Sequence, residues 1–261
     1  MKKGKLVIIF LIVMAVIWAK PAPSQAYSIF RIFSDGSSVT RFFQSINIMK
    51  PWQCGDTLNF TYKGGSVTYG TVNVSGQCFM DRNLGASQAA TAYNDTASYG
   101  DYFQWGRLDD NHQNSNSGTT GTQSSGDVPG HGNFILGYAD WRSPQNNNLW
   151  QSASSYTNNP CPFGWHIPLQ AEWSTAMTNL GLASCSSNCL QAMANSSLKI
   201  PTAGYRVYFD GALSSQGSFG YYWSSSPNST YAYLLFFGSA GVDPAGYVHR
   251  ADGLTARCLK N

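Results

Sequence analysis

Residues 57–74, TLNFTYKGGSVTYGTVNV, alternate apolar and polar side chains on both sides of Gly64-Gly65. A period of two sends successive side chains to opposite faces of a β-strand, and a glycine pair between two such runs favours a tight turn. The pattern therefore predicts a β-hairpin in this part of the chain.

Residues 168–181, PLQAEWSTAMTNLG, follow a helical period instead. Trp173, Met177 and Leu180 recur at i, i+4 and i+7, and a glycine follows as a stop signal. We expect a helix here. Glu172, the only glutamate of the chain, falls in its first turn, where the positive end of the helix dipole favours a carboxylate.

Two other segments complete the expected fold. Residues 111–132 are rich in Ser, Thr, Asn and Gly, and we expect a surface loop. From Ile200 onward, short apolar runs alternate with Gly, Ser and Asn, which predicts short strands joined by turns. The predicted class is α+β, mostly β and irregular, with small twisted antiparallel sheets, few helices and long loops.

Residues 231–253, YAYLLFFGSAGVDPAGYVHRADG, depart from simple alternation. The run LLFF at 234–237 places apolar side chains on both faces of a strand. In the expected register, Leu235 and Phe237 point inward. The outward set is then Leu234, Phe236 and Gly238.

The first 26 residues have the features of a secretion signal. Lys2, Lys3 and Lys5 precede an apolar run from 6 to 18, and Ser-Gln-Ala at 24–26 offers small residues for cleavage. The apolar run is shorter than the roughly 20 residues that span a membrane. We expect a mature chain that starts near Tyr27, has no membrane span and is secreted or held at the cell surface. The alternative is an uncleaved anchor.

Behind the signal, residues 27–51 form a predicted spacer with a short amphipathic stretch around Val39, Phe42, Phe43 and Ile46. Residues 52–261 are enough for one domain with a well-buried core. Only 11% of residues are charged, and the net charge of +3 includes the signal lysines. The absence of a basic stripe argues against nucleic-acid binding.

Six cysteines follow the signal, an even number that favours disulfides in an exported protein. Sequence alone leaves fifteen pairings open. We favour Cys54–Cys78 across the N-terminal hairpin, Cys185–Cys189 as a local link and Cys161–Cys258 as the long-range one. The spacings lack Cys-x-x-Cys pairs and nearby histidines, so a zinc site is not expected.

Six ordered segments carry a resemblance to a known family. They are FMDRNLGA at 79–86, YGDYFQWGR at 99–107, CPFGWHIPLQAEW at 161–173, IPTAGYR at 200–206, YYWSSS at 221–226 and ARCL at 256–259. In these segments the chain resembles the Fibrobacter succinogenes major paralogous domain, from about Trp52 to Leu259. The resemblance implies a C-type-lectin-like fold whose termini meet, which suits a Cys161–Cys258 link. Relatives of that fold include the formylglycine-generating type of enzyme.

The same motifs have structural explanations. Trp165, Trp173 and Trp223 are large side chains of the kind that fill cores. His166 is expected to be a hydrogen-bonded core residue rather than a catalyst. Glu172 is expected to be structural.

The residue inventory argues against an enzyme. Glycoside hydrolysis usually needs two facing carboxylates, and no such pair is evident. No nucleophile-elbow motif is present. The formylglycine-generating relatives use two late cysteines, whereas here only Cys258 lies late. We predict no catalytic residues and no cofactor.

Calcium-dependent sugar binding is a weaker alternative. Asp109, Asp110 and Asn111 form an oxygen-rich run that could ligate Ca²⁺. A polar loop entry is the favoured explanation of the run, so no metal ligand is predicted; a structural Ca²⁺ stays an alternative. The chain lacks the Glu-Pro-Asn and Gln-Pro-Asp triplets of sugar-binding C-type lectins, so no sugar specificity is predicted.

The C-terminal region also resembles C-type-lectin-like proteins diversified by bacterial retroelements, in which adenine-containing codons are randomised while scaffold codons stay fixed. In this region, a set of residues lies between the scaffold residues, and each of them is reachable from an AAC or AAT codon by changing only adenines. The set is Tyr231, Leu234, Phe236, Gly238, Gly241, Asp243, Gly246, Tyr247, Val248, His249 and Asp252.

With Tyr222, these positions form the predicted ligand-binding surface, within residues 222–252. Exposed aromatics suit this role because they bury large areas at low entropic cost. The resemblance implies an exported protein that binds an unknown protein or glycan at a cell surface. The alternatives are a structural or adhesive surface protein whose C-terminal strand is core, and, third, an enzyme.

Overall fold

The computed structural model describes residues 51–151 and 157–261. The predicted signal peptide and nearly all of the predicted spacer lie outside these residues. The chain divides between Trp52 and Gln53, and the unit Gln53–Asn261 contains all the elements described below. Among the described residues, no helix combines the length and the apolar character needed to cross a membrane.

The predicted hairpin is confirmed. β1 (Leu58–Tyr62) pairs antiparallel with β2 (Gly65–Tyr69). The turn falls one residue earlier than the glycine pair, at Lys63 and Gly64, which both have positive φ. Two consecutive positive φ values match the twist of a tight hairpin, and glycine adopts one of them without steric cost.

A four-stranded sheet brings the two ends of this unit together. Its order is β3-β4-β15-β8, and all its pairs are antiparallel. The strands are β3 (Thr71–Val74), β4 (Gln77–Met80), β15 (Leu259–Lys260) and β8 (Trp165–His166). The last strand of the chain therefore lies between early and middle segments.

The remaining short elements lie in the loop-rich middle of the chain and near its end. A second four-stranded sheet has the order β10-β9-β14-β5, and β6 and β7 form a parallel pair. The elements are the 3₁₀ helix η1 (Thr96–Ser98), β5 (Phe103–Gln104), β6 (Thr119–Thr120), β7 (Phe134–Ile135), β9 (Tyr205–Arg206), β10 (Leu213–Ser214) and β14 (Gly253–Leu254).

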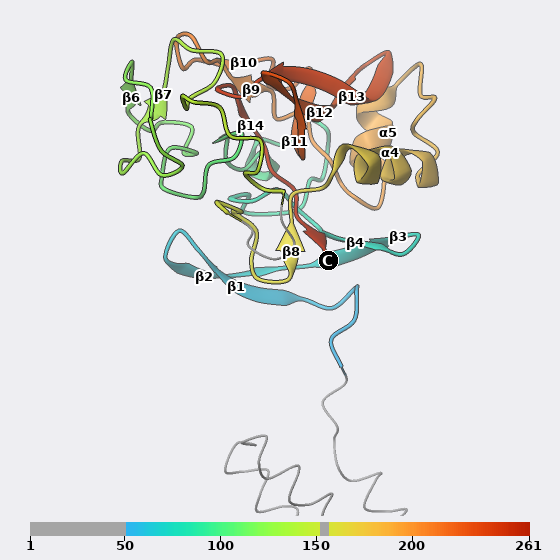
Figure 1. Cartoon of the computed structure of the whole chain (residues 1–261). Coiled ribbons are helices and arrows are strands. Elements are labelled where there is room, and N and C mark those ends of the chain that lie inside the picture. The colour runs from blue at the N-terminus through green and yellow to red at the C-terminus, as the bar shows by residue number, and fades with distance from the viewer. Residues whose placement is uncertain (1–50, 152–156) are drawn as a thin grey trace, which may run out of the picture. The chain divides into compact units, whose positions relative to one another are not determined.

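The longest strands form a three-stranded antiparallel sheet. β11 (Gly220–Asn228), β12 (Tyr231–Gly238) and β13 (Gly241–His249) follow one another and pair in that order. The prediction of short strands after residue 200 holds for β9, β10 and β14 but is wrong for these three. Figure 1 shows the sheet beside α4 and α5, at the opposite end of the unit from β3 and β4.

The predicted helix is confirmed as α4 (Gln170–Asn179), with Trp173 and Met177 fully buried. Glu172 lies in its first turn, where the carboxylate accepts a hydrogen bond from the backbone N–H of Leu169 at 2.7 Å. A second helix, α5 (Cys189–Asn195), was not predicted. Its seven residues are too few to display a helical period in the sequence.

β12 is buried on both faces because a separate core covers each of them. Leu234 belongs to a cluster with Trp105, Trp141 and Trp223. Leu235 and Phe237 belong to a second cluster, which includes side chains of α4 and α5. The apolar run on both faces of this strand thus follows from its middle position in the sheet, between two cores.

All three favoured disulfides are present, and they use all six cysteines: Cys54–Cys78, Cys161–Cys258 and Cys185–Cys189. The long-range link joins the segment before β8 to the one before β15. The predicted core tryptophans are also confirmed, since Trp165, Trp173 and Trp223 are at most 3% exposed.

Three of the ordered sequence segments meet in one buried hydrogen-bond network. The guanidinium of Arg257 donates to the side-chain oxygen of Asn83 and to the carbonyls of Met80 and Leu198. The amide of Asn83 donates in turn to the hydroxyl of Tyr222, 3.1 Å away. Burial lowers the pKa of Arg257 to about 10, so it remains charged at neutral pH. The network ties β4 to the C-terminal sheets.

The predicted surface loop at 111–132 is only partly correct. His112 and Gln113 are fully buried, and Thr119 and Thr120 form β6. His112 Nδ1 lies 2.6 Å from the carboxylate of Asp110, and its Nε2 accepts the backbone N–H of Gln104. These bonds satisfy both ring nitrogens, which explains why the His112 side chain can enter the core.

Candidate binding surface

Aromatic rings cross the three-stranded sheet at one end. Tyr221, Phe236 and Asp243 are direct neighbours across β11, β12 and β13. The ring of Phe236 stacks on Phe219 at 5.6 Å and meets Tyr221 at 5.1 Å. Tyr221 in turn lies 4.7 Å from Tyr205. These side chains are half-buried or exposed, so ring edges and faces remain open to solvent.

A second aromatic group lies at the other end of β12. Tyr231 lies 5.1 Å from His249 and 5.4 Å from Tyr247, measured between ring centroids. His249 also contacts Tyr208, at 4.6 Å. Tyr247 is 58% exposed. Burial lowers the pKa of His249, which keeps its ring neutral at pH 7.

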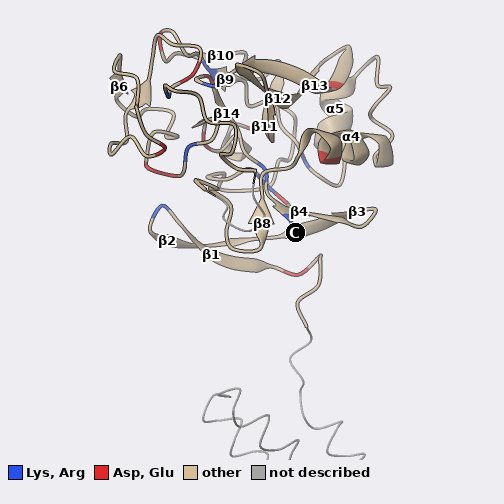
Figure 2. Cartoon of the chain, in the orientation of Figure 1, with Lys and Arg blue, Asp and Glu red and all other residues tan. Residues whose placement is uncertain are grey.

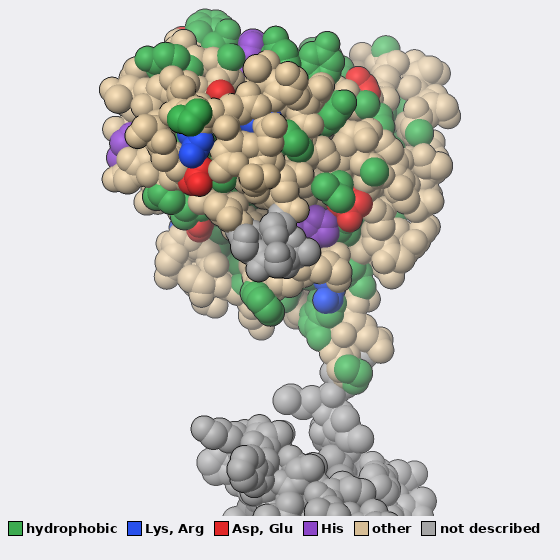
Figure 3. Space-filling view, in the orientation of Figure 1, with side chains coloured by type: hydrophobic (Ala, Val, Ile, Leu, Met, Phe, Trp, Pro, Cys, Tyr) green, Lys and Arg blue, Asp and Glu red, His purple; other side chains and the backbone are tan. Residues whose placement is uncertain are grey.

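Residues 205–209 contribute a ring to each group, since Tyr205 contacts Tyr221 of the first and Tyr208 contacts His249 of the second. We call the combined region the aromatic surface; it comprises Tyr205, Tyr208, Phe209, Phe219, Tyr221, Tyr231, Phe236, Tyr247 and His249. The three strands carry a single charged side chain, Asp243, as Figure 2 illustrates. Figure 3 shows hydrophobic side chains gathered along the upper edge, over β10, β12 and β13, with a histidine among them.

Asp252 lies buried behind this surface. It is 4% exposed, and its Oδ1 accepts the backbone N–H of Tyr208 at 3.0 Å. Burial raises the pKa of Asp252 to about 7, against the lowering effect of the hydrogen bond from the Tyr208 backbone. The carboxyl group therefore holds the Tyr208 backbone in place, next to the ring of His249.

A pH-dependent stability follows from Asp252. In the unfolded chain the carboxyl ionises near pH 4, whereas in the folded chain it stays protonated up to about pH 7. Its contribution to stability is complete below pH 4, falls between pH 4 and 7 and is lost above that. Asp252→Asn should thus become more stable relative to the wild type by on the order of 4 kcal/mol across this window.

Urea unfolding of both proteins at a series of pH values measures this difference. Asp210→Asn is the matched control. Because Asp210 is exposed, the difference in unfolding free energy between this variant and the wild type should not change with pH. A difference for Asp252→Asn that does not change between pH 4 and 7 would contradict the assignment.

The structure places eight of the twelve predicted binding positions at least partly at the surface: Tyr231, Phe236, Gly241, Asp243, Gly246, Tyr247, Val248 and His249. It buries the other four, which are Tyr222, Leu234, Gly238 and Asp252. For those four the predicted contact role is wrong.

Each correction has a physical reason. Tyr222 is buried in the Arg257 network, and its hydroxyl donates to the carbonyl of Pro201 at 2.6 Å. Leu234 was predicted to face outward but packs in the core, because a layer of side chains covers that face of β12 as well. The ring of Phe219 covers Gly238, where a Cβ would come within 2.8 Å of it. The inward prediction for Leu235 and Phe237 is confirmed.

Sequence reasoning missed the aromatic residues that precede the predicted positions along the chain. Tyr205, Tyr208 and Phe209 come from β9 and the following loop, and Phe219 and Tyr221 from the start of β11. A period-two pattern at 219–222 was available: the exposed Phe219 and half-buried Tyr221 alternate with a buried glycine and the buried Tyr222. Nothing local indicated that residues 205–209 would join them.

The polar run Asp109–Asn111 and the pair His166 and Glu172 both have structural partners. The carboxylate of Asp110 binds the guanidinium of Arg107 at 2.6 Å and the ring of His112 at 2.6 Å, so its oxygens are already engaged. In the described part of the chain, no three His, Cys, Asp or Glu side chains gather as a metal-binding group. His166 is half-buried between Glu172, at 2.9 Å, and Asn261, at 2.6 Å.

Comparison with known proteins gives no further guidance. No protein-family model matches the chain, and neither the curated proteins nor the solved structures include a match.

Proposed function

We propose that the protein is an exported binding protein that recognises its ligand through the aromatic surface, without chemistry on the ligand. The observation that carries the proposal is the exposure of aromatic side chains on a framework that two cores and three disulfides hold rigid. Large aromatic side chains at a solvent boundary lose little entropy on binding and supply most of the energy in many interfaces. The three disulfides agree with an oxidising, extracellular compartment.

We assign the framework to the C-type-lectin-like class and to the major paralogous domain family that the six segments resemble. The pairing of β15 with β4 and β8 supports this assignment, because that fold has termini that meet. The small antiparallel sheets, two helices and long loops of the described residues are compatible with it. Three of the six segments, 79–86, 221–226 and 256–259, meet in the hydrogen-bond network around Arg257, which gives a structural reason for their presence in one domain.

Retroelement diversification is the more specific part of the proposal. Eight of the positions reachable from adenine-containing codons lie at least partly at the surface, interleaved with buried scaffold residues such as Leu235 and Phe237. Such an arrangement lets contact residues change while the cores stay constant. The buried members, Leu234 and Asp252 among them, are expected to stay fixed.

The coding locus tests diversification directly. We expect a reverse-transcriptase gene nearby and a near-copy of the 3′ coding segment with adenines at the codons of the exposed positions. Deep sequencing of a cultured population should show substitutions at the codons of Tyr231, Asp243 and Tyr247 but none at those of Leu235 and Phe237. Equal, background-level variation at both sets would contradict diversification.

A structural or adhesive surface protein is the second candidate. The burial of β12 on both faces favours it, because that burial explains the LLFF run without any ligand. An enzyme is a distant third, since the disulfides occupy every cysteine that a formylglycine-generating mechanism would need.

A further inference from the structure

The aromatic surface has a carboxylate directly beside its stacked rings. Asp243 stands opposite Phe236 in the ladder between β12 and β13, and Tyr221 stands opposite Phe236 on the other side. Directly opposite residues project from the same face of a sheet, with Cβ atoms about 5 Å apart. A π-face and a negative charge are thus presented together.

Gly246 lies between the two side chains. A Cβ at this position would lie 3.4 Å from the Cβ of Phe236, 3.6 Å from Oδ2 of Asp243 and 3.6 Å from Cγ of Leu234, so Phe236 and Asp243 both approach this point of the backbone closely. An open hollow of about 400 Å³ adjoins the pair and is lined by Phe219, Phe236 and Asp243 among others.

The charge of Asp243 is not neutralised within the described residues. It is exposed, its Oδ1 accepts the backbone N–H of Ala245 at 2.9 Å, and none of the ion pairs in the described part of the chain includes it. The other strand residues of this sheet are uncharged. The stacked rings of Phe219, Phe236 and Tyr221 therefore have one negative charge, that of Asp243, beside them, which complements a cation on an apolar stem.

We propose that this corner of the aromatic surface, formed by Phe236, Gly246 and Asp243, is a subsite for a cationic side chain, an arginine or lysine, of a partner protein. The proposal rests on the proposed binding function and names its ligand chemistry. A guanidinium or ammonium group above the Phe236 ring gains cation–π attraction, and Asp243 holds its charge. The methylene stem lies along the Phe236 ring, in the hollow that Phe219 and Asp243 also line. A neutral glycan would stack on the rings but would make no use of the charge.

The test is an NMR titration of ¹⁵N-labelled protein with acetyl-Gly-Arg-Gly amide. The matched neutral peptide carries citrulline, which has the same shape as arginine and no charge. We expect the arginine peptide to shift the amide signals of Phe236, Asp243 and Gly246, and the citrulline peptide to shift them much less. The shifts should shrink as salt is raised, because an exposed ion pair is screened.

Three variants locate the subsite. Asp243→Asn should weaken the arginine peptide roughly two- to fivefold, as expected for loss of one exposed ion pair. Gly246→Val should abolish its shifts, because the added side chain would stand between Phe236 and Asp243. Asp210→Asn is the matched control: Asp210 is also exposed, and its Oδ1 likewise accepts a backbone N–H two residues on, from Ala212 at 2.9 Å. It should bind the peptide like the wild type.

The outcomes separate this inference from the proposed function. Equal binding of both peptides, or equal effects of Asp243→Asn and Asp210→Asn, overturns the cationic subsite while the aromatic surface still binds. Shifts with methyl glucoside but not with the arginine peptide overturn it in favour of a neutral glycan. If no probe shifts any residue of the aromatic surface, the cationic subsite is refuted; the diversification test at the coding locus is independent of that result.

Discussion

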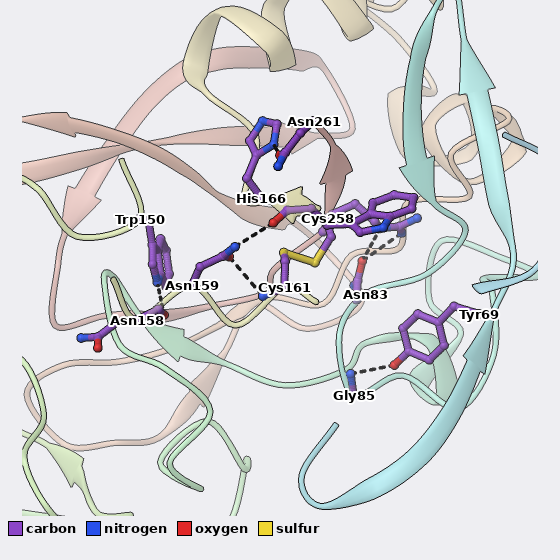
Figure 4. The surroundings of a disulfide bond; sticks show 12 residues. Tyr69, Asn83, Gly85, Trp150, Asn158, Asn159, Cys161, His166, Cys258 and Asn261 are labelled. Carbon is purple, nitrogen blue, oxygen red and sulfur yellow. Dashed lines mark hydrogen bonds between the residues drawn. A yellow bond between two sulfur atoms is a disulfide. The ribbon is translucent and has the colours of Figure 1, made fainter. Parts of the chain in front are cut away.

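Removing the Cys161–Cys258 disulfide should lower the free energy of unfolding by about 4–5 kcal/mol. The bond closes a loop with a sequence separation of 97, and in the chain-entropy account a loop of about 100 residues contributes about 4.7 kcal/mol. Figure 4 shows the bond among the segments that it joins. Beside it, the side chain of Asn159 accepts the backbone N–H of Cys161 and donates to the carbonyl of Trp165. Denaturant unfolding of a double alanine variant measures the loss.

The local disulfide provides the matched control. Cys185 and Cys189 have a sequence separation of only 4, so the same account predicts a smaller loss, roughly 2 kcal/mol, for their double alanine variant. Equal losses for the two variants would contradict the loop-length explanation. A free thiol at Cys258 in correctly folded wild-type protein would refute the pairing itself and would revive a reactive-cysteine role.

Leu234→Ala should destabilise the fold as severely as Leu235→Ala, by about 3–5 kcal/mol each. The two leucines are 1% and 0% exposed and point into different cores, so each substitution leaves a cavity in a close-packed region. This expectation differs from the one based on the strand pattern, in which Leu234 faces solvent. Thermal and urea unfolding measure both losses.

Tyr247→Ala is the control on the neighbouring strand. Tyr247 is 58% exposed, and substitutions at exposed positions usually change stability by about 0.5 kcal/mol or less. The three positions lie within one hairpin, so general weakness of the C-terminal region cannot produce the pattern. A small effect of Leu234→Ala together with a large one of Tyr247→Ala would show that the assignment of core and surface is reversed.

Local patterns were informative where they involved neighbouring residues. The hairpin at 58–69 could be predicted because alternation and turn residues occur within one short segment. The helix at 170–179 could be predicted because Trp173 and Met177 mark a single buried stripe. α5 was missed because a helix of seven residues shows no period, and the burial of His112 was missed because composition does not reveal the partners that its ring finds.

The aromatic surface shows the same division. The resemblance to retroelement-diversified proteins identified Tyr231, Phe236, Tyr247 and His249 as surface candidates, since each is reachable from an AAC or AAT codon by changing only adenines. It could not show that residues 205–209 would contact them, because that contact joins segments separated by about 40 residues and depends on how β9 and β14 pair.

For this protein, the linear pattern was enough to specify the elements whose information is local: the hairpin, α4 and the apolar character of β12. It left fifteen cysteine pairings open, and the set that we favoured among them is the one that the structure has. How many faces of β12 are covered depended on the packing of distant segments, because a strand's pattern records which side chains are apolar and not what packs over them. A second core over the Leu234 face turned an expected contact residue into a buried one and left the aromatic rings and Asp243 at the surface.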